Sequence, residues 1–162
     1  NKEICLRELT NSDANKTHLS WLKDKKTNQF LISKNKNHTI LSLKKEIYKY
    51  RKNNNYFFLA IILKNNNQHI GNIKIGPINN NNKNTYIGIL IGNKKYKNKG
   101  FESMAIKLVV KFIFENKNIN INKLISRINI NNIASIKSFK KAGFILDDKI
   151  NNKLKQDYYI KK

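Results

Sequence analysis

Cysteine is nearly absent from this sequence, and its apolar runs are short. One of the 162 residues is cysteine (Cys5), which excludes an intramolecular disulfide and a cysteine-rich metal site, so no metal is expected. A lone thiol makes a reducing, cytoplasmic location the default expectation. The longest apolar run, Tyr56–Leu63, has the length of a strand, so no membrane span is predicted. The first residues also lack the charged-then-apolar pattern of a signal peptide.

Acidic residues are scarce as well. Ten Asp and Glu face 33 Lys and Arg, which gives a formal net charge of +23. A charge of this size first suggests a nucleic-acid partner. All but three of the cations (Arg7, Arg51 and Arg127) are Lys, however, and Lys is accompanied by many Asn and Ile, as A/T-rich coding would produce. Because Arg is preferred for bidentate base and phosphate contacts, a nucleic-acid partner is disfavoured.

The apolar residues that are present predict a globular chain. They make up 40% of the sequence and include one Trp, seven Tyr and eight Phe. The length suits one domain, residues 1–162. Segments rich in β-branched and aromatic residues predict strands at 4–9, 56–64, 69–76, 85–92 and 123–130. Short Asn-rich connectors predict that the second, third and fourth strands form an antiparallel meander.

Helical periodicity appears between these strands. It predicts helices over 13–24, with Ser12 as N-cap, over 42–51, over 101–115 and over 133–142, which would end at Gly143. The tail 144–160 predicts a hairpin around Asn151–Asn152. The resulting order of elements gives one α/β domain with a mixed sheet.

The segment Asn93–Lys107, NKKYKNKGFESMAIK, joins a predicted strand to a predicted helix. A helix start presents unpaired backbone N–H groups, and Gly100 would let them approach phosphate oxygens with no Cβ in the way. More positive charge would come from the lysines of this turn, Lys94, Lys95, Lys97 and Lys99. Each of these lysines is equally consistent with an ordinary solvated surface.

Together with the downstream segment NNIASIKSFKKAGF (131–144), this loop resembles the GNAT superfamily of acetyl-CoA-dependent acetyltransferases. The resemblance implies a mixed, mostly antiparallel sheet flanked by helices, which is an α/β (α+β) fold. It also implies acetyl-CoA as cofactor. The main chain of one strand would pair with the pantetheine arm, and the loop and downstream segment would complete the site. The implied cofactor residues are Ile89, Leu90, Ile91, Lys97, Asn98, Lys99, Gly100, Phe101, Glu102, Ser103, Asn132, Ser135 and Phe139.

Three positions depart from the family pattern. Glu102 stands where Gly or Ala is preferred, and we expect it to serve the helix start or to point to solvent. Tyr86 replaces the Glu that often acts as base, and Phe139 replaces the Tyr that often acts as acid, so Phe139 is interpreted as packing. The base candidates are therefore His38, then His69 and His18, or a water chain ending at Tyr86 or at a backbone carbonyl.

The segments 6–31, 38–47 and 69–78 resemble a subgroup that acts on amino sugars and on the N-termini of ribosomal proteins. This likeness predicts transfer of acetyl by direct attack of a primary amine, most simply that of a nucleotide-linked amino sugar in surface glycan synthesis. The acceptor side would include Trp21, His38 and Tyr86, with Asp24 either binding the amine or capping a helix. A protein N-terminal acetyltransferase and an inactive coenzyme A-binding module are the alternatives. A homodimer is considered as the assembly.

Overall fold

The computed structural model describes residues 3–148 and 154–162. One seven-stranded sheet runs through it in the order β1-β2-β3-β4-β5-β7-β6. β4 and β5 are parallel and every other neighbouring pair is antiparallel, which confirms the mixed, mostly antiparallel sheet. The strands are β1 (Ile4–Glu8), β2 (Phe57–Leu63), β3 (His69–Ile75), β4 (Asn84–Ile91), β5 (Lys123–Asn129), β6 (Ile145–Leu146) and β7 (Lys155–Lys161).

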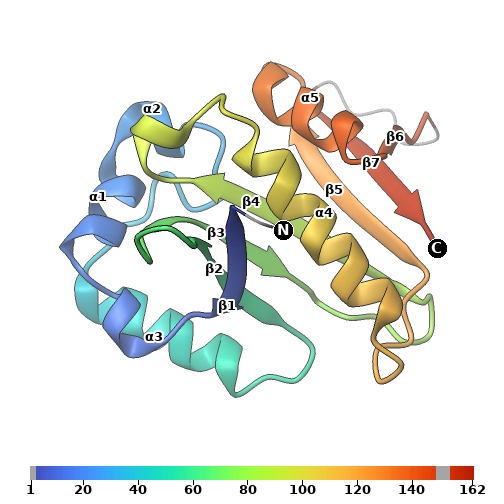
Figure 1. Cartoon of the computed structure of the whole chain (residues 1–162), viewed down its shortest axis with the longest axis horizontal. Coiled ribbons are helices and arrows are strands. Elements are labelled where there is room, and N and C mark those ends of the chain that lie inside the picture. The colour runs from blue at the N-terminus through green and yellow to red at the C-terminus, as the bar shows by residue number, and fades with distance from the viewer. Residues whose placement is uncertain (1–2, 149–153) are drawn as a thin grey trace.

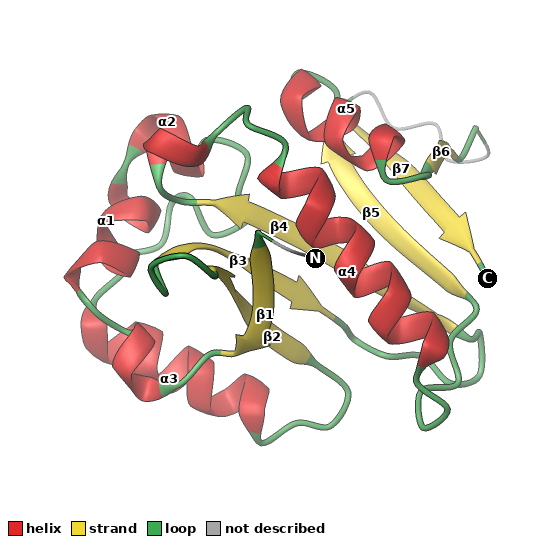
Figure 2. Cartoon of the chain, viewed as in Figure 1, coloured by secondary structure: helices red, strands yellow, loops and turns green. Residues whose placement is uncertain are grey.

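Five α-helices and two 3-10 turns connect the described strands (Figures 1 and 2). The helix 101–115 is present as predicted, the helix 133–142 is one residue shorter, and the meander of β2, β3 and β4 is confirmed. β6 and β7 pair as the predicted hairpin, whose turn at 151–152 lies outside the described residues. The elements are η1 (Asn11–Asp13), α1 (Lys16–Lys23), α2 (Lys25–Asn28), α3 (Ile40–Arg51), η2 (Lys94–Tyr96), α4 (Phe101–Glu115) and α5 (Ile133–Lys141).

The prediction of one helix over 13–24 was wrong. Asn15, and not Ser12, caps α1, because its side chain accepts a hydrogen bond from the His18 N–H at 3.0 Å. Asp24 ends α1 and caps α2, and its carboxylate accepts from the Thr27 N–H at 2.8 Å. The helix predicted from residue 42 begins two residues earlier, at Ile40.

Helices cover both faces of the sheet, which explains why β2 is apolar throughout. Ile61 and its alternate neighbours on β2 pack with Ile106 and Val109 of α4, whereas Phe58 and its alternate neighbours pack with α1 and with Ile47 of α3. Figure 1 shows α4 crossing one face, with α1 and α3 to the left. No helix among the described residues is long and apolar enough to span a bilayer.

A gap in the sheet positions the site. β4 and β5 pair only from Asn84 to Tyr86 and from Lys123 to Ile125. Beyond these residues the two strands diverge, and no ladder joins them in the described part of the chain. The other edge of β4 stays hydrogen-bonded to β3 as far as Ile91. One edge of β4 is therefore free next to the start of α4 (Figure 1).

Candidate active site

The turn from β4 into α4 is shaped by backbone conformations that favour Gly and Asn. Asn98 has φ of +59° and Gly100, the N-cap of α4, has φ of +85°. A Cβ built on Gly100 would meet only the Met104 Cε, at 3.9 Å, so the turn is not blocked. No side chain caps α4. The other described α-helices each have a side-chain cap, from Asn15, Asp24, Thr39 and Asn132.

The open start of α4 suits a phosphate. Its first N–H groups lack a side-chain partner, and the helix dipole adds partial positive charge at the same place. Gly100 and the N–H groups that follow it could hold the pyrophosphate of coenzyme A here. Lys99 and Asn98 beside it are exposed.

Two lysines of this turn are bonded to α2. The Lys97 ammonium donates to the Thr27 hydroxyl at 2.9 Å, and burial lowers the pKa of Lys97. The Lys94 ammonium bonds to the Asp24 carboxylate at 2.8 Å. This contact with Lys94, together with hydrogen bonds from Thr27, holds the pKa of Asp24 at about 2. These two bonds connect the turn before α4 to α2.

Glu102 lies in the first turn of α4, as one of its two expectations had it, but the other expectation, a side chain that points to solvent, was wrong. Its carboxylate is largely shielded between α4 and α5, and accepts a hydrogen bond from the Ser135 hydroxyl at 2.8 Å. Burial raises the pKa of Glu102. The Asn132 side chain, the cap of α5, accepts from the Ser135 N–H at 3.3 Å. These three predicted cofactor residues therefore form a chain of hydrogen bonds between the first turns of α4 and α5.

The remaining predicted cofactor residues are of two kinds: those of β4, predicted to act through their main chain, and those whose side chains pack within the protein. Ile89 and Leu90 lie opposite Ile73 and Asn72 of β3, and β5 is no longer paired with β4 at these two positions. Several side chains hold the turn itself. Ser103 donates to the Gly100 carbonyl at 2.9 Å, and Phe101 packs edge-on against Tyr96. Phe139, only 1% exposed, packs against Phe144, which agrees with its interpretation as packing.

Tyr86 lies on the open face of β4. It is 37% exposed, and the Arg127 guanidinium lies 5.7 Å from its ring centre. Arg127 is in turn fixed by two hydrogen bonds, at 2.7 and 2.8 Å, to the buried Asp157. Two residues further along β4, a Cβ on Gly88 would meet no atom within 4 Å. We call the face of β4 from Tyr86 past Gly88 the open track, because no other atom covers it at Gly88.

His38 lies in the loop between α2 and α3 and is buried. Its Nε2–H donates to the Ser33 carbonyl at 3.0 Å, which leaves Nδ1 as the basic nitrogen. No hydrogen bond or ring contact found in the described ranges joins His38 to Tyr86, so the structure does not bring the two predicted catalytic residues into contact.

The other histidines belong to a buried polar cluster that the sequence did not reveal. The Asn72 amide of β3 donates to the His18 ring at 2.7 Å and accepts from the His69 ring at 2.8 Å. Burial lowers the pKa of His18 to about 4, so it is neutral at pH 7. Trp21 packs on this cluster and covers Gly92, where a Cβ would lie 2.0 Å from the indole ring. The signal for the cluster in the sequence was Asn72, a polar residue between the apolar Ile70 and Ile73 of β3.

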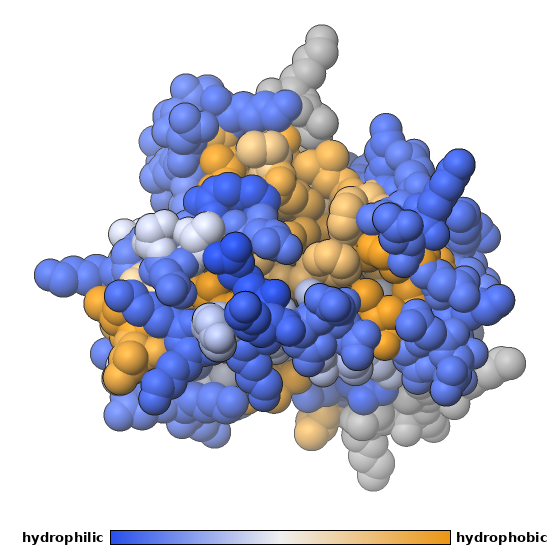
Figure 3. Space-filling model, turned by 90° about the horizontal axis from the view of Figure 1, so that it is seen from below, coloured by the Kyte–Doolittle hydropathy of each residue, from blue (hydrophilic) through white to orange (hydrophobic). Residues whose placement is uncertain are grey.

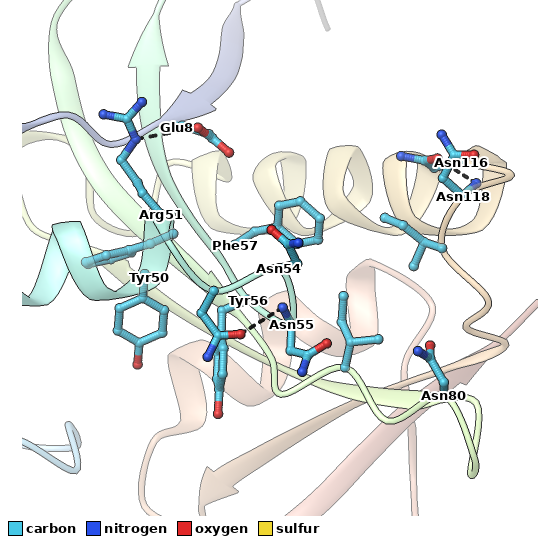
Figure 4. Close-up of a pocket in the computed structure, with 14 residues that line it drawn as sticks. Glu8, Tyr50, Arg51, Asn54, Asn55, Tyr56, Phe57, Asn80, Asn116 and Asn118 are labelled. Atoms are coloured by element: carbon cyan, nitrogen blue, oxygen red, sulfur yellow. Dashed lines mark hydrogen bonds and ion pairs between the residues drawn. The ribbon is translucent and has the colours of Figure 1, made fainter.

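Two hollows lie at opposite ends of the domain. We call the first, of about 490 Å³, the α2 pocket; it is lined by Leu22, Lys23, Lys25, Asn28, Gln29, Lys34, Asn35, Lys36, Asn37 and His38. The second, of about 420 Å³, lies where β2 begins and α4 ends. Its lining combines apolar residues, among them Phe57, Ile78 and Ile119, with several asparagines, of which Figure 4 labels Asn54, Asn55, Asn80, Asn116 and Asn118. Figure 3, seen from below, shows apolar residues gathered in the centre of that end.

A strand with a free edge that leads into an open, glycine-capped helix could accommodate an acyl-coenzyme A. The family description "Acetyltransferase (GNAT) domain" matches residues 3–145, and the chain belongs to this family. It is an acyltransferase, and its acetyl donor is acetyl-CoA.

Solved structures of similar fold cover nearly the whole chain. A domain from Methanocaldococcus jannaschii DSM 2661 is 26% identical, with a TM-score of 0.78 and 98% of each chain covered. Spermidine N-acetyltransferase from Vibrio cholerae, solved with CoA and spermine, is 16% identical (TM-score 0.84; 99% and 96% covered). The microcin C7 self-immunity acetyltransferase MccE, solved with acetyl-CoA and AMP, is 19% identical (TM-score 0.82; 100% and 94% covered). Among curated proteins no significant match was found.

Proposed function

We propose that this enzyme transfers acetyl from acetyl-CoA to the primary amine of a nucleotide-linked amino sugar, as in surface glycan synthesis. The proposed binding of acetyl-CoA rests on one observation, the uncapped start of α4 beside the free edge of β4. Bound acetyl-CoA supplies the acetyl group as an activated thioester. The protein contributes the phosphate cradle at Gly100, the main chain of Ile89 to Ile91 for the pantetheine amides, and the open track along Gly88 for the acceptor.

The charges of the chain argue against a polyamine as the acceptor. A polycation would need several free carboxylates close together. Most carboxylates are already paired with a cation of the chain itself, namely Asp13, Asp24, Glu46, Glu115, Asp147, Asp157 and Glu8. A neutral or anionic acceptor fits this surface better. The AMP in the MccE structure supports a nucleotide in particular, since a similar fold holds it together with acetyl-CoA.

Direct transfer, without an acetyl-enzyme, agrees with the position of the single thiol. Cys5 lies on β1, at one edge of the sheet, with β2 and β3 between it and β4. A nucleophile must reach the thioester, and Cys5 is separated from the gap beside β4 by two strands. Proton removal from the amine is assigned to His38 or to water held near Tyr86. Because its one cysteine is unpaired, we also propose that the protein is intracellular. We propose a homodimer as its assembly.

A panel of amines tests the acceptor. Coenzyme A should first raise the free energy of unfolding, by about 2.7 kcal/mol at 100 times its dissociation constant. Release of the free coenzyme A thiol is then followed with a nucleotide-linked amino sugar, the free amino sugar, a peptide with a free N-terminus, and spermidine. We expect the highest kcat/KM with the nucleotide-linked sugar. A preference for the peptide would indicate an N-terminal acetyltransferase, and cofactor binding with no turnover would indicate an inactive binding module.

A further inference from the structure

We propose that the α2 pocket is an anion site, and that it binds the phosphate groups of the acceptor. This proposal rests on the proposed function, because it assigns part of the substrate to a place in the fold. The pocket is a concave surface of about 490 Å³ formed by the end of α1, by α2 and by the loop before α3. Phosphate oxygens carry concentrated negative charge, and the pocket offers the opposite charge from several directions.

Four lysines line the α2 pocket. Lys23 comes from the end of α1 and Lys25 from the start of α2, whereas Lys34 and Lys36 come from the facing loop. No Asp or Glu lines the pocket. The nearest carboxylate in sequence, that of Asp24, is bonded to Lys94 and to the Thr27 N–H, outside this lining. The positive charge of the pocket is therefore not neutralised within it.

The loop that carries two of these lysines is held in shape by the protein. The Lys34 N–H donates to the Leu31 carbonyl at 3.2 Å and the Lys36 N–H to the Ser33 carbonyl at 3.0 Å. The buried His38 ring donates to the same Ser33 carbonyl at 3.0 Å. His38 thus anchors the loop through Nε2 and also lines the pocket.

The α2 pocket is linked to the cofactor turn through α2. Thr27 of α2 accepts from Lys97, and Asp24 at its N-cap pairs with Lys94. The pocket and the phosphate cradle at Gly100 therefore lie on two sides of one short helix. This favours a phosphate of the acceptor over an unrelated anion, since the acceptor must meet the thioester within the same domain.

The other hollow provides an internal comparison. Arg51 is the only cation among its lining residues, and it pairs with Glu8 (Figure 4). In a chain with 33 cations, a random surface of this size would be expected to collect several lysines. Lysine density therefore varies from one hollow to the other, and the cationic lining of the α2 pocket is a local feature of the surface.

A binding experiment tests the site separately from catalysis. Titration calorimetry would measure binding of uridine diphosphate and of inorganic pyrophosphate to the protein saturated with coenzyme A, so that the cradle at Gly100 is occupied. In the Lys34→Gln/Lys36→Gln variant we expect the dissociation constant to rise about tenfold, because two exposed charge contacts are lost. Lys25→Gln should give a smaller rise, of about threefold. The matched control is Lys26→Gln, whose side chain is adjacent in sequence, exposed and outside the pocket.

The outcomes distinguish this proposal from the proposed function. Equal weakening in the pocket variants and in Lys26→Gln, or no weakening at all, would overturn the anion site even if acetyl transfer to an amine is observed. Loss of diphosphate binding in the pocket variants alone would support the site even if no acceptor is acetylated. Binding of RNA without any binding of diphosphate would also overturn it. With an active acceptor, the pocket variants should raise its KM and leave the KM for acetyl-CoA unchanged.

Discussion

The two longest helices, α3 and α4, cover opposite faces of the same sheet and begin in opposite ways. At α3 the Thr39 hydroxyl accepts from the Ser42 N–H at 3.0 Å, and the Ser42 hydroxyl interacts with the Thr39 N–H at 2.9 Å. At α4 the cap is Gly100 in the left-handed conformation, with no side chain to offer. One helix satisfies its first amides within the chain, whereas the other leaves them for a ligand.

This difference locates the cofactor site better than charge does. Lysines surround the turn before α4, but two of them are bonded to α2. With 33 cations in the chain, lysine alone marks no particular surface. An uncapped helix start beside an unpaired strand edge occurs only at α4 in the described ranges. The backbone therefore carries more information about function here than the charged side chains do.

The largest effect on coenzyme A affinity should come from a side chain placed at the N-cap of α4. Gly100→Asp places a carboxylate where a phosphate would bind, and we expect coenzyme A to bind at least about 100-fold more weakly, since charged hydrogen bonds contribute about 1.5–3 kcal/mol each. Because Asp tolerates positive φ, the free energy of unfolding should fall by only about 1 kcal/mol. Titration calorimetry and chemical unfolding measure the two quantities.

Gly143→Asp is the control for backbone strain. Gly143 also has a positive φ, of +96°, but it follows the end of α5 and not the start of a helix. This variant should lose at least as much stability, because a Cβ on Gly143 would also lie 3.2 Å from the Ile160 Cδ1, and it should keep its affinity for coenzyme A. Equal loss of affinity in the two variants would mean that the Gly100 effect is general destabilisation.

A smaller effect is expected at Glu102, the residue that places a carboxylate in the first turn of α4. Glu102→Gln retains an acceptor for the Ser135 hydroxyl and removes negative charge near the cradle. We expect coenzyme A to bind about tenfold more tightly at pH 8, as a nearby charge at an effective dielectric near 20 would predict after screening. Unchanged or weaker binding in calorimetry would contradict this role.

The same variant carries a pH signature. Because burial raises the pKa of Glu102, the folded protein retains a proton that the unfolded chain releases between the two pKa values. Stability therefore falls as the pH rises through that window. Glu102→Gln has no titrating carboxyl at this position, so its advantage in unfolding free energy should be absent in acid and should grow towards neutral pH.

The smallest effect is expected at the N-cap of α3, which a side chain already satisfies. Thr39→Ala removes the cap of α3 and should cost about 1 kcal/mol of stability, with the affinity for coenzyme A unchanged. Thr39→Ser, which keeps the hydroxyl, should recover most of this loss in chemical unfolding. A change in cofactor affinity on opening α3 would break the contrast between the two helices.

Local pattern was enough to predict α4 and its turn. A glycine, a first-turn acid and an apolar stripe over 101–115 are all contained in one segment, and the structure has the helix at those bounds. The start of α1 was mispredicted because Asp13 bonds back to the preceding residues Thr10 and Arg7. The Asp13 carboxylate accepts from the Thr10 N–H at 2.7 Å and from both terminal nitrogens of Arg7, which makes a separate 3-10 turn of residues 11–13.

The contacts between site residues depend on how the elements pack, so they could not be predicted from the sequence. Ser135 meets Glu102 across 33 positions, only because α4 and α5 lie beside the same gap. Asn72 meets His18 across 54 positions in the same way. Periodicity states which face of an element is apolar, but it does not state which polar groups on two faces will meet.

The bond between Lys97 and Thr27 has a consequence for the order of events. An ammonium has three N–H donors, and Thr27 takes one of them. The other two can serve a phosphate oxygen, so one side chain would hold helix and donor together. Occupancy of the donor half would then stiffen α2 and organise the acceptor half, and thermodynamic reciprocity requires the acceptor to strengthen donor binding by the same factor.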